Sequence, residues 1–460
     1  MTGPALRLLH AIHDFLPAHR AGSEIYAHHL CRALQDAGHH VTLVCAVYAP
    51  QRPHGHVEWR LYDRLPVIEI TNNWPAAGFE HTYRDPLMRQ RLASALHAVQ
   101  PHVVHIHNLL NLSFDLPGLA LAQGARTVAT LHDYTLVCPS GGQRLHAAEA
   151  HLCRTIDPAR CARCFGESPF GRRLSVAHLA PGGSLPAPLL GAARAARALL
   201  PRAFTAAAAR LPGPAVSAQD IEVRLAHARR VFDEVDLFVA PARATGAEFI
   251  ELGVPPHKVR ISDYGMSPFE AVSRPGPRGR LRLGFVGTLV PHKGVHLLID
   301  AIRQLPADRV EAVVFGDLTT FPDYTARLRA AAQQLPVRFE GRFSGTDLRQ
   351  VYGQMDVLVV PSTWLENSPL VIHEAQMAGV PVVGSAIGGI PDLVQHEVNG
   401  LLVEPDSVRD LAAALRRLID EPTLLAGLAA HPMPVKTIEQ DAAEWAGVYA
   451  DVLASTAVMA

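Results

Sequence analysis

The chain has 460 residues, of which 48% are hydrophobic and 18% are charged, and its formal net charge is −1. This ordinary globular composition argues against disorder, and the length favours two domains of roughly 200 residues each. The near-neutral charge gives no overall attraction for nucleic acid. No apolar run reaches the ~20 residues of a membrane span, and the N-terminus lacks the pattern of a signal peptide, so we expect a cytoplasmic protein.

The first half of the chain alternates apolar strands with helices. A helix over about residues 24–37, ended by Gly38, follows the first strand. The expected strands are residues 6–12, 41–47, 103–106, 126–131 and 237–240. This alternation predicts a parallel sheet with helices on both faces.

A second α/β unit follows a linker at residues 267–280, which holds three prolines and two glycines. Its expected strands are residues 281–287, 311–315, 337–340, 357–360 and 381–384, and a helix near residues 438–453 closes the chain. We therefore expect domains at residues 1–266 and 281–435, with an insertion at about 138–220 and a C-terminal segment at 436–460. Two such sheets would bind ligand at the carboxyl ends of their strands.

Two glutamates flank the start of a predicted helix in the second domain. Glu366 lies in the loop after an apolar strand, and Glu374 lies about one and a half turns into the helix. Ser368 is the predicted N-cap, with Pro369 at the first helical position. The unpaired N–H groups of that helix end favour a phosphate, and carboxylates accept hydrogen bonds from sugar hydroxyls. The pattern therefore predicts a sugar-nucleotide site.

A glycine turn and a lysine follow the first strand of the second domain. Gly287 would let the backbone approach a diphosphate, and Lys293 would supply a positive charge. The alternative is a lysine that is only solvated. A second strand-to-helix glycine turn at Gly388 and Gly389 supports a phosphate-binding rim.

Taken together, these residues resemble the family 4 retaining glycosyltransferases of the GT-B fold, in which two Rossmann-like parallel-sheet domains face each other across a cleft. The specific part is the Glu-x7-Glu pattern of Glu366 and Glu374, in the run PSTWLENSPLVIHEAQMAGVPVVGSAIGGIPDLVQHEVNGLLV. The runs VGTLVPHKG, AGSE, GHHVTLV, PHVVHIHN and VATLHDY support the match over most of the chain. The resemblance implies that the first domain selects the acceptor, that the second binds the donor, and that the last helix packs back on the first domain.

The resemblance also implies roles for individual residues. Glu374 would hold the nucleotide ribose, Glu366 would face the donor sugar and Lys293 would bind the diphosphate. His132 would contact the donor sugar near the reacting centre; without the motif it reads as a strand-end histidine bonded to backbone. The implied catalytic residues are His132, Glu366 and Lys293. The implied donor-binding residues are Gly22, Gly287, Thr288, Lys293, Asn367, Ser368, Pro369, Leu370 and Glu374.

Two positions depart from the family pattern. Thr288 stands where the family often has an arginine, which puts one diphosphate contact in doubt. Ala21 precedes Gly22 where the family often has two glycines, and it fits only if the loop needs no positive φ there. Asp133, beside His132, is read as structural.

The expected reaction transfers a sugar from a nucleotide-sugar to a saccharide or lipid-linked acceptor with retention, as in bacterial polysaccharide biosynthesis. The leaving diphosphate is the expected base, and no catalytic metal is expected because no Asp-x-Asp motif appears where a GT-A enzyme needs one. The pattern does not specify the donor base, the sugar or the acceptor. A non-catalytic sugar-nucleotide-binding scaffold is the alternative. A dinucleotide-dependent oxidoreductase is disfavoured because no G-x-G-x-x-G follows the first strand.

Four cysteines fall within 27 residues of the insertion, and two of them form a C-x2-C pair. This spacing suits a closed, structural zinc site, and His146 or His151 could replace a cysteine. An iron–sulfur cluster and unbound reduced thiols are the alternatives. The cysteines are Cys138, Cys153, Cys161 and Cys164.

The segment from 168 to 219 holds six arginines and no acidic residue. The favoured interpretation is a solvated helix that packs on the first domain. The alternative is peripheral contact with an anionic membrane at the inner face, where a lipid-linked acceptor would lie.

Overall fold

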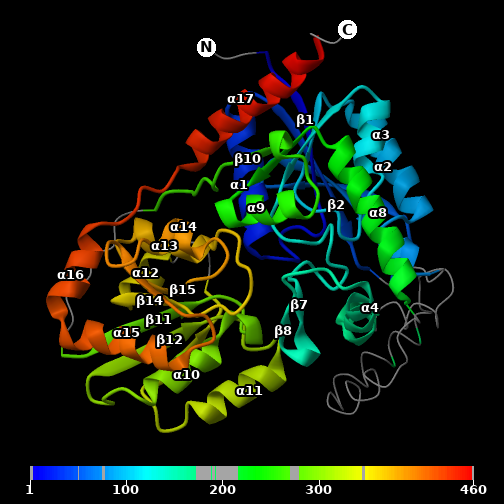
Figure 1. Ribbon diagram of the computed structural model, residues 1–460. Coiled ribbons are helices and arrows are strands. Elements are labelled where there is room, and N and C mark those ends of the chain that lie inside the picture. Colours follow the sequence, from blue (N-terminus) through cyan, green and yellow to red (C-terminus); the bar gives the residue numbers. More distant parts are fainter. Residues whose placement is uncertain are drawn as a thin grey trace. The chain divides into compact units, whose positions relative to one another are not determined.

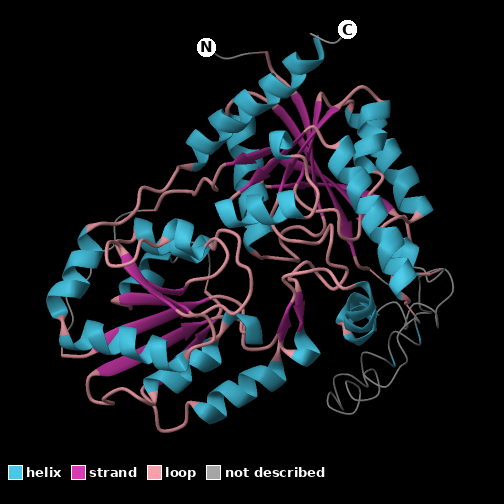
Figure 2. Cartoon of the chain, in the orientation of Figure 1, coloured by secondary structure: helices cyan, strands magenta, loops and turns pink. Residues whose placement is uncertain are grey.

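The first sheet of the computed structural model contains eight strands in the order β10-β9-β6-β5-β1-β2-β4-β3 (Figures 1 and 2). All neighbouring strands are parallel except β3 and β4, which pair antiparallel at one edge. The strands are β1 (Arg7–Ile12), β2 (His40–Val47), β3 (Val57–Tyr62), β4 (Leu65–Thr71), β5 (Val103–Ile106), β6 (Arg126–Thr130), β9 (Leu237–Ala240) and β10 (Val259–Ile261). The predicted parallel α/β organisation is confirmed.

The structure describes residues 4–49, 51–74, 78–171, 216–269, 279–343 and 348–457, together with residues 188 and 192. The chain forms two units. Unit 1 comprises Met1–Ala240, Gly246–Ser262 and Glu439–Ala460, and unit 2 comprises Pro241–Thr245 and Asp263–Ile438.

Helices lie on both sides of the sheet of unit 1, with α1 and α17 on one side and α2, α3 and α8 on the other (Figure 1). A 3-10 turn, η1 (Phe79–Thr82), precedes α2, and another, η3 (Pro256–Lys258), precedes β10. The helices are α1 (Gly22–Asp36), α2 (Pro86–Val99), α3 (Leu116–Ala122), α8 (Ala218–Glu234), α9 (Arg243–Glu251), which crosses from unit 2 into unit 1, and α17 (Ile438–Ala457). Helix α17 is anchored in unit 1 by hydrogen bonds of Asp441 with the Tyr26 hydroxyl and of the Tyr449 hydroxyl with His105, each 2.8 Å long.

The second sheet contains six parallel strands in the order β13-β12-β11-β14-β15-β16. They are β11 (Leu281–Val286), β12 (Val310–Phe315), β13 (Val337–Gly341), β14 (Val357–Val360), β15 (Val382–Ser385) and β16 (Gly400–Val403). The helical elements of this unit are η4 (Pro291–Lys293), α10 (Val295–Ile302), α11 (Pro322–Ala331), α12 (Leu348–Gly353), α13 (Leu370–Met377), α14 (Ile390–Leu393), α15 (Val408–Asp420) and α16 (Pro422–Ala430). Aliphatic side chains of strands and helices form its core, among them Leu283, Val314, Val359, Leu298 and Leu415.

The strand order of each sheet fixes where a ligand can bind. In unit 2 the chain runs outward from β11 through β12 to β13, and then from β14 outward through β15 to β16 on the other side. In unit 1 the direction reverses in the same way between β1 and β5. Loops diverge at such a switch point and leave a crevice at the carboxyl ends of the two strands.

Parts of the insertion can be placed. A short hairpin of β7 (Leu145–His146) and β8 (His151–Leu152), with a 3-10 turn η2 (Ala147–Glu149) between them, precedes helix α4 (Pro158–Glu167). The arginine-rich segment 168–219 lies outside the described residues except at 168–171, 188, 192 and 216–219, and most of the 267–280 linker lies outside them as well. Among the described helices, none is both long and apolar enough to cross a membrane.

Candidate functional site

An ion pair lies at the switch point of unit 2. The Lys293 ammonium donates a hydrogen bond of 2.6 Å to Glu366 Oε1, and the Ser362 hydroxyl donates another of 2.6 Å to the same oxygen. The Glu366 side chain is only 5% exposed, whereas that of Lys293 is 27% exposed. Burial alone would raise the pKa of Glu366, but the Lys293 charge and these hydrogen bonds lower it below the usual value. Glu366 is therefore ionised, and Lys293 keeps one side toward solvent.

The turn that carries Lys293 is held against the end of β14. Gly294 follows η4 with φ +75°, and a Cβ there would lie 1.9 Å from the carbonyl oxygen of Pro361. The Thr363 N–H also donates a 2.9 Å hydrogen bond to the His292 carbonyl. Only glycine allows this approach, so the sequence KG positions the lysine beside the loop of Glu366.

The glycine turn after β15 supports the same loop from the other side. A Cβ on Gly388 would lie 2.2 Å from the Glu366 carbonyl oxygen, and one on Gly389 would lie 1.6 Å from the Asn367 carbonyl oxygen. The Gly389 N–H donates a 2.7 Å hydrogen bond to Glu366. These two glycines were interpreted as part of a phosphate-binding rim. In the structure the space that they leave is filled by the Glu366 loop.

The predicted capping role of Ser368 is wrong. Helix α13 begins at Leu370 with Pro369 as its N-cap, and no side chain caps it. The Ser368 hydroxyl instead lies 2.6 Å from Asp263 Oδ1 and 2.8 Å from His373 Nε2. This bonding leaves the first N–H groups of α13 without a side-chain acceptor, which is the arrangement that accepts an anion.

Glu374 lies one turn inside α13 and is held by a tyrosine. Tyr352 lies in α12, and its hydroxyl donates a 2.6 Å hydrogen bond to Glu374 Oε2. Burial raises the pKa of Glu374 to about 7, against the opposing effects of Tyr352 and His373. One carboxylate oxygen is thus positioned by the protein and the other, Oε1, has no such partner among the described residues. Glu374 can accept hydrogen bonds from a ligand when it is ionised.

The remaining predicted donor-binding residues of unit 2 also follow the carboxyl ends of its strands. Gly287 directly follows β11, and Thr288 is exposed beside it. The Asn367 side chain is buried and accepts a 2.7 Å hydrogen bond from the Thr245 hydroxyl. Ser362 and Tyr352 were not predicted. Ser362 could have been found because it ends the β14 run, but Tyr352 carries no signal in its local sequence.

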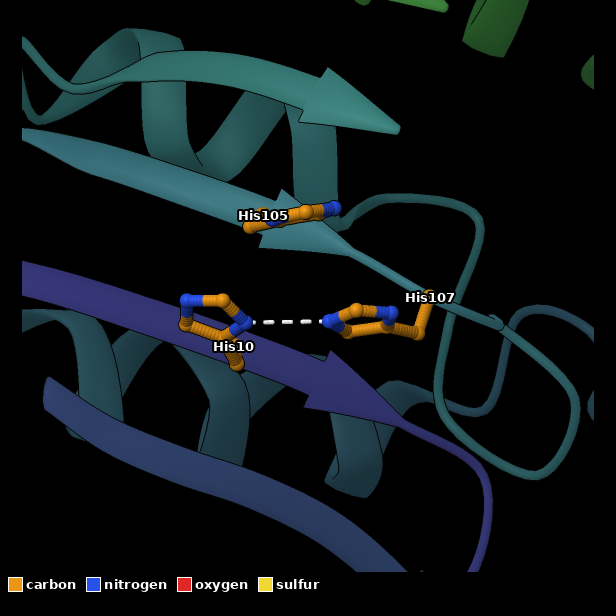
Figure 3. Close-up of side chains that lie close together, drawn as sticks. All are labelled: His10, His105 and His107. Carbon is orange, nitrogen blue, oxygen red and sulfur yellow. Dashed lines mark hydrogen bonds between the residues drawn. The ribbon is translucent and has the colours of Figure 1, made fainter. Parts of the chain in front are cut away.

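In unit 1, four histidines gather where β1, β5 and β6 end. Figure 3 shows His10, His105 and His107, with His10 Nδ1 hydrogen-bonded to His107 Nε2 at 2.9 Å. His107 Nδ1 in turn lies 3.0 Å from Nε2 of His132, the predicted sugar-contacting residue. His105 uses both ring nitrogens, on the hydroxyls of Tyr449 and Thr130.

The histidine chain is neutral. Burial lowers the pKa of His10 and of His132 to about 3, and the pKa of His107 is also lowered well below its usual value. A neutral imidazole has one N–H, so His107 accepts at one nitrogen and donates at the other. The tautomers of His10 and His132 are therefore coupled through His107. Nε2 of His10 has no hydrogen-bond partner in the described part of the chain.

The glycine loop of unit 1 is closed by a buried carboxylate. Ala21 is the N-cap of α1 with φ −127°, so it needs no positive φ and its replacement of a glycine is tolerated as expected. Its N–H donates a 3.0 Å hydrogen bond to Glu24 Oε2. Burial alone would raise the pKa of Glu24, but His19 and His13, each 3.3 Å away, lower it to about 2. Gly22, the first residue of α1, is exposed beside this group.

Asp133 holds the loop after β6, as the structural interpretation expects. Its carboxylate accepts hydrogen bonds of 2.8 Å from the Asn108 side chain and of 2.7 Å from the Thr135 N–H. The four cysteines of the insertion line one small cavity in unit 1.

Two family models match the chain. The model described as Glycosyltransferase Family 4 matches residues 20–179, and the model described as Glycosyl transferases group 1 matches residues 280–421. The chain belongs to the family 4 glycosyltransferases. The two matched regions hold Gly22 and His132 in unit 1 and the Glu366 and Glu374 loop in unit 2.

Relatives of this family 4 glycosyltransferase support the assignment. A D-inositol 3-phosphate glycosyltransferase of Thermobispora bispora is 32% identical over 231 residues, which cover 45% of this chain and 53% of the relative. A putative colanic acid biosynthesis glycosyltransferase, WcaL of Salmonella typhimurium, is 30% identical over 209 residues, 43% of this chain and 51% of the relative. The chain thus spans about half the length of the curated relatives it matches.

Solved structures place this family 4 glycosyltransferase in the GT-B fold. The crystal structure of HepE from Anabaena in complex with UDP and glucose has a TM-score of 0.59 and 18% sequence identity, and the match covers 99% of each chain.

Proposed function

We propose that the protein transfers a sugar from a nucleotide-sugar to a saccharide or lipid-linked acceptor, with retention of the anomeric configuration. The observation that carries the proposal is the arrangement at the switch point of unit 2. A partly exposed cation at Lys293, the uncapped start of α13 and the carboxylate of Glu374 lie at the carboxyl-end side of the sheet of unit 2. A nucleotide-sugar offers the complementary groups, which are a diphosphate and ribose hydroxyls.

Each residue has a role in this proposal. The α13 N–H groups and Lys293 bind the diphosphate, and Glu374 accepts hydrogen bonds from the ribose. Glu366 holds Lys293 in place through its 2.6 Å ion pair and presents its backbone toward the sugar. As the bond between sugar and diphosphate breaks, negative charge develops on the leaving oxygen, and these fixed groups stabilise it. The departing diphosphate takes the proton of the acceptor hydroxyl. Because Lys293 and the α13 N–H groups already offset the charge of the diphosphate, no added divalent cation is required.

Unit 1 contributes His132 in the same proposal. Its neutral imidazole can hydrogen-bond a sugar hydroxyl without placing a second positive charge near an oxocarbenium-like transition state. Gly22 offers a backbone without a side chain at the start of α1. The acceptor is proposed to be selected by unit 1. Relatives that act on inositol 3-phosphate or in colanic acid biosynthesis suggest which acceptors to test first.

The test is turnover of a sugar-nucleotide panel, headed by UDP-glucose because HepE has been crystallised with it. The proposal expects release of nucleoside diphosphate and transfer of labelled sugar, in the presence of EDTA, with at least one donor. Turnover should be lost in Glu374→Ala and kept in Glu421→Gln, the control at an exposed residue after α15. That result would place the transfer reaction at the Glu374 site. Tight donor binding without transfer or hydrolysis would instead support the scaffold alternative.

A further inference from the structure

Four cysteines from three separate segments surround one small cavity in unit 1. They are Cys138, Cys153, Cys161 and Cys164, and the cavity has a volume of about 20 Å³. A cavity of that size holds one water-sized object, so it suits a single ion. All four residues are free thiols with intermediate exposure. The other two cysteines of the chain, Cys31 and Cys45, are buried elsewhere.

The local fold delivers the sulfurs from different directions. Cys138 ends the loop after β6, where its N–H donates a 2.7 Å hydrogen bond to Tyr134. Cys153 directly follows β8, and its N–H bonds Arg144 across the hairpin at 2.7 Å. Cys161 and Cys164 lie three residues apart on α4, which places both on one face of the helix. A loop, a hairpin and a helix thus each contribute cysteines to the wall of one cavity.

We propose that these four cysteines bind a zinc ion as thiolates, in a closed tetrahedral site that stabilises the insertion rather than taking part in transfer. Zinc takes four sulfur ligands at about 2.3 Å, which leaves no open position for substrate. The proposal does not depend on the proposed function.

The described part of the insertion has only a small core of its own. Its two strands contain two residues each, and only Ala162 and Phe165 of α4 are buried. Segments with so small a core commonly gain their stability from a metal or from disulfides. The Asp157 side chain caps α4 by accepting hydrogen bonds from the N–H groups of Ala159 and Arg160. The start of the helix that carries two of the cysteines is therefore capped without a metal.

Other candidate ligands are already engaged. His146 Nε2 lies 2.7 Å from Glu167 Oε2, so this nitrogen already has a partner and is not turned toward a metal in place of a cysteine. Within the described chain, two groups of side chains have all their ligand atoms within 4.8 Å, and both consist of histidines with or without Glu24. The four sulfurs are more widely spaced, so zinc binding requires their side chains to rotate inward to the ~2.3 Å bond length.

Arg144 is held beside the cysteines by contacts of its own. It lines the cavity, stacks 5.3 Å from the Tyr134 ring and bonds Glu248 and the Arg154 carbonyl. Its positive charge, with that of Arg160 in the same cavity wall, opposes the −2 charge of a zinc ion with four thiolates.

The test is the metal content of the full-length protein, purified under reducing conditions without added metal. We expect one zinc per chain by elemental analysis, released in step with the titration of four thiols by a mercurial. The Cys161→Ser/Cys164→Ser variant should lose the zinc, whereas Cys31→Ala/Cys45→Ala should keep it.

Because the first variant can misfold, the wild-type protein supplies a second readout. Removal of its zinc should lower the melting temperature, and zinc but not magnesium should restore it. Zinc at background level, a Cys–Cys disulfide found by mass spectrometry, or iron with visible absorbance would each overturn the proposal.

Discussion

The Tyr352 hydroxyl donates a 2.6 Å hydrogen bond to Glu374 Oε2, and this contact lowers the pKa of the residue proposed to hold the ribose, against the larger effect of burial. Burial raises the pKa of Glu374 to about 7, so near neutral pH the carboxyl exists in both forms. Only the ionised form accepts hydrogen bonds at both oxygens. The pH dependence of donor binding therefore reports directly on this pair.

Donor affinity should rise as the pH increases through about 7. A nucleotide-sugar is the suitable probe, because its diphosphate is esterified at both ends and has no group that titrates in this range. In Tyr352→Phe the hydrogen bond that lowers the pKa of Glu374 is lost, so the midpoint should move to higher pH. Isothermal titration calorimetry at several pH values measures both midpoints. An affinity that is independent of pH in both proteins would contradict the assignment of Glu374.

The same carboxyl should make the stability of unit 2 depend on pH. Its folded-state pKa of about 7 exceeds the ordinary value of 4.5, so the native state binds the proton more tightly than the unfolded chain. The stabilisation is complete below about 4.5 and is lost as the pH rises through about 7. Wild type should thus lose on the order of 2 kcal/mol between these limits relative to Glu374→Gln. Denaturant unfolding of both proteins at pH 5 and pH 8 measures the difference, and equal slopes with pH would refute it.

Breaking the Lys293–Glu366 pair should destabilise unit 2. Lys293→Met leaves the buried carboxylate of Glu366 without its cation, and we expect a loss of about 2–3 kcal/mol, because Lys293 is partly exposed. The loss should shrink as the pH falls, because burial without the lysine charge raises the pKa of Glu366 and protonation removes its unpaired charge. Lys293→Met/Glu366→Gln should recover much of the stability but not donor binding. Urea unfolding of the two variants at pH 8 and pH 5 tests this, and a pH-independent loss would count against it.

Gly294 should tolerate no side chain. In Gly294→Ala the new Cβ would lie 1.9 Å from the Pro361 carbonyl oxygen, at a φ of +75°, so the turn of Lys293 must move. We expect a loss of more than ~2 kcal/mol and weaker donor binding. Gly427→Ala is the control, because α16 leaves open space at that position, and it should stabilise the helix by up to ~1 kcal/mol. Melting temperatures that rank the two variants the other way would contradict the packing argument.

The histidine chain should stay neutral and hold one tautomer. Nitrogen-15 NMR of histidine-labelled protein should show His132 unprotonated at pH 5.5, because burial lowers its pKa to about 3. In His107→Leu the hydrogen bond from His107 to His132 is lost, and the balance between the two tautomers of His132 should shift. A wild-type His132 that titrates between pH 6 and 7 would show that the chain does not form.

Much of the fold could be predicted because buried parallel strands are short apolar runs. Strands β5, β9 and β14 have the predicted bounds, since each run begins after a polar residue and ends before a histidine or a proline. The antiparallel edge of β3 and β4 was missed, because four of the six residues of β3 are only partly buried and the other two are exposed. Edge strands carry less hydrophobic signal than central ones.

The site could be predicted only in part. The motif indicates Glu366, Glu374 and Lys293, but nothing local shows that Lys293 pairs with a glutamate 73 residues away. Ser368 was assigned to the helix cap from local preference, whereas Asp263, 105 residues away, bonds its hydroxyl. Contacts of this kind depend on tertiary structure and leave no periodic pattern in the sequence.

The most direct test of the donor site is calorimetric titration of a sugar nucleotide that the wild-type protein turns over, into wild type, Glu374→Ala, Lys293→Ala and Glu421→Gln. Glu421 is exposed and directly follows Asp420, which pairs with Arg309 just before the start of β12. Glu421 therefore lies near the amino ends of the strands, away from the donor site at their carboxyl ends. Affinity at pH 8 should fall at least tenfold, or about 1.4 kcal/mol, in the first two variants and remain unchanged in the third. Wild-type affinity in folded Glu374→Ala and Lys293→Ala proteins would contradict the account.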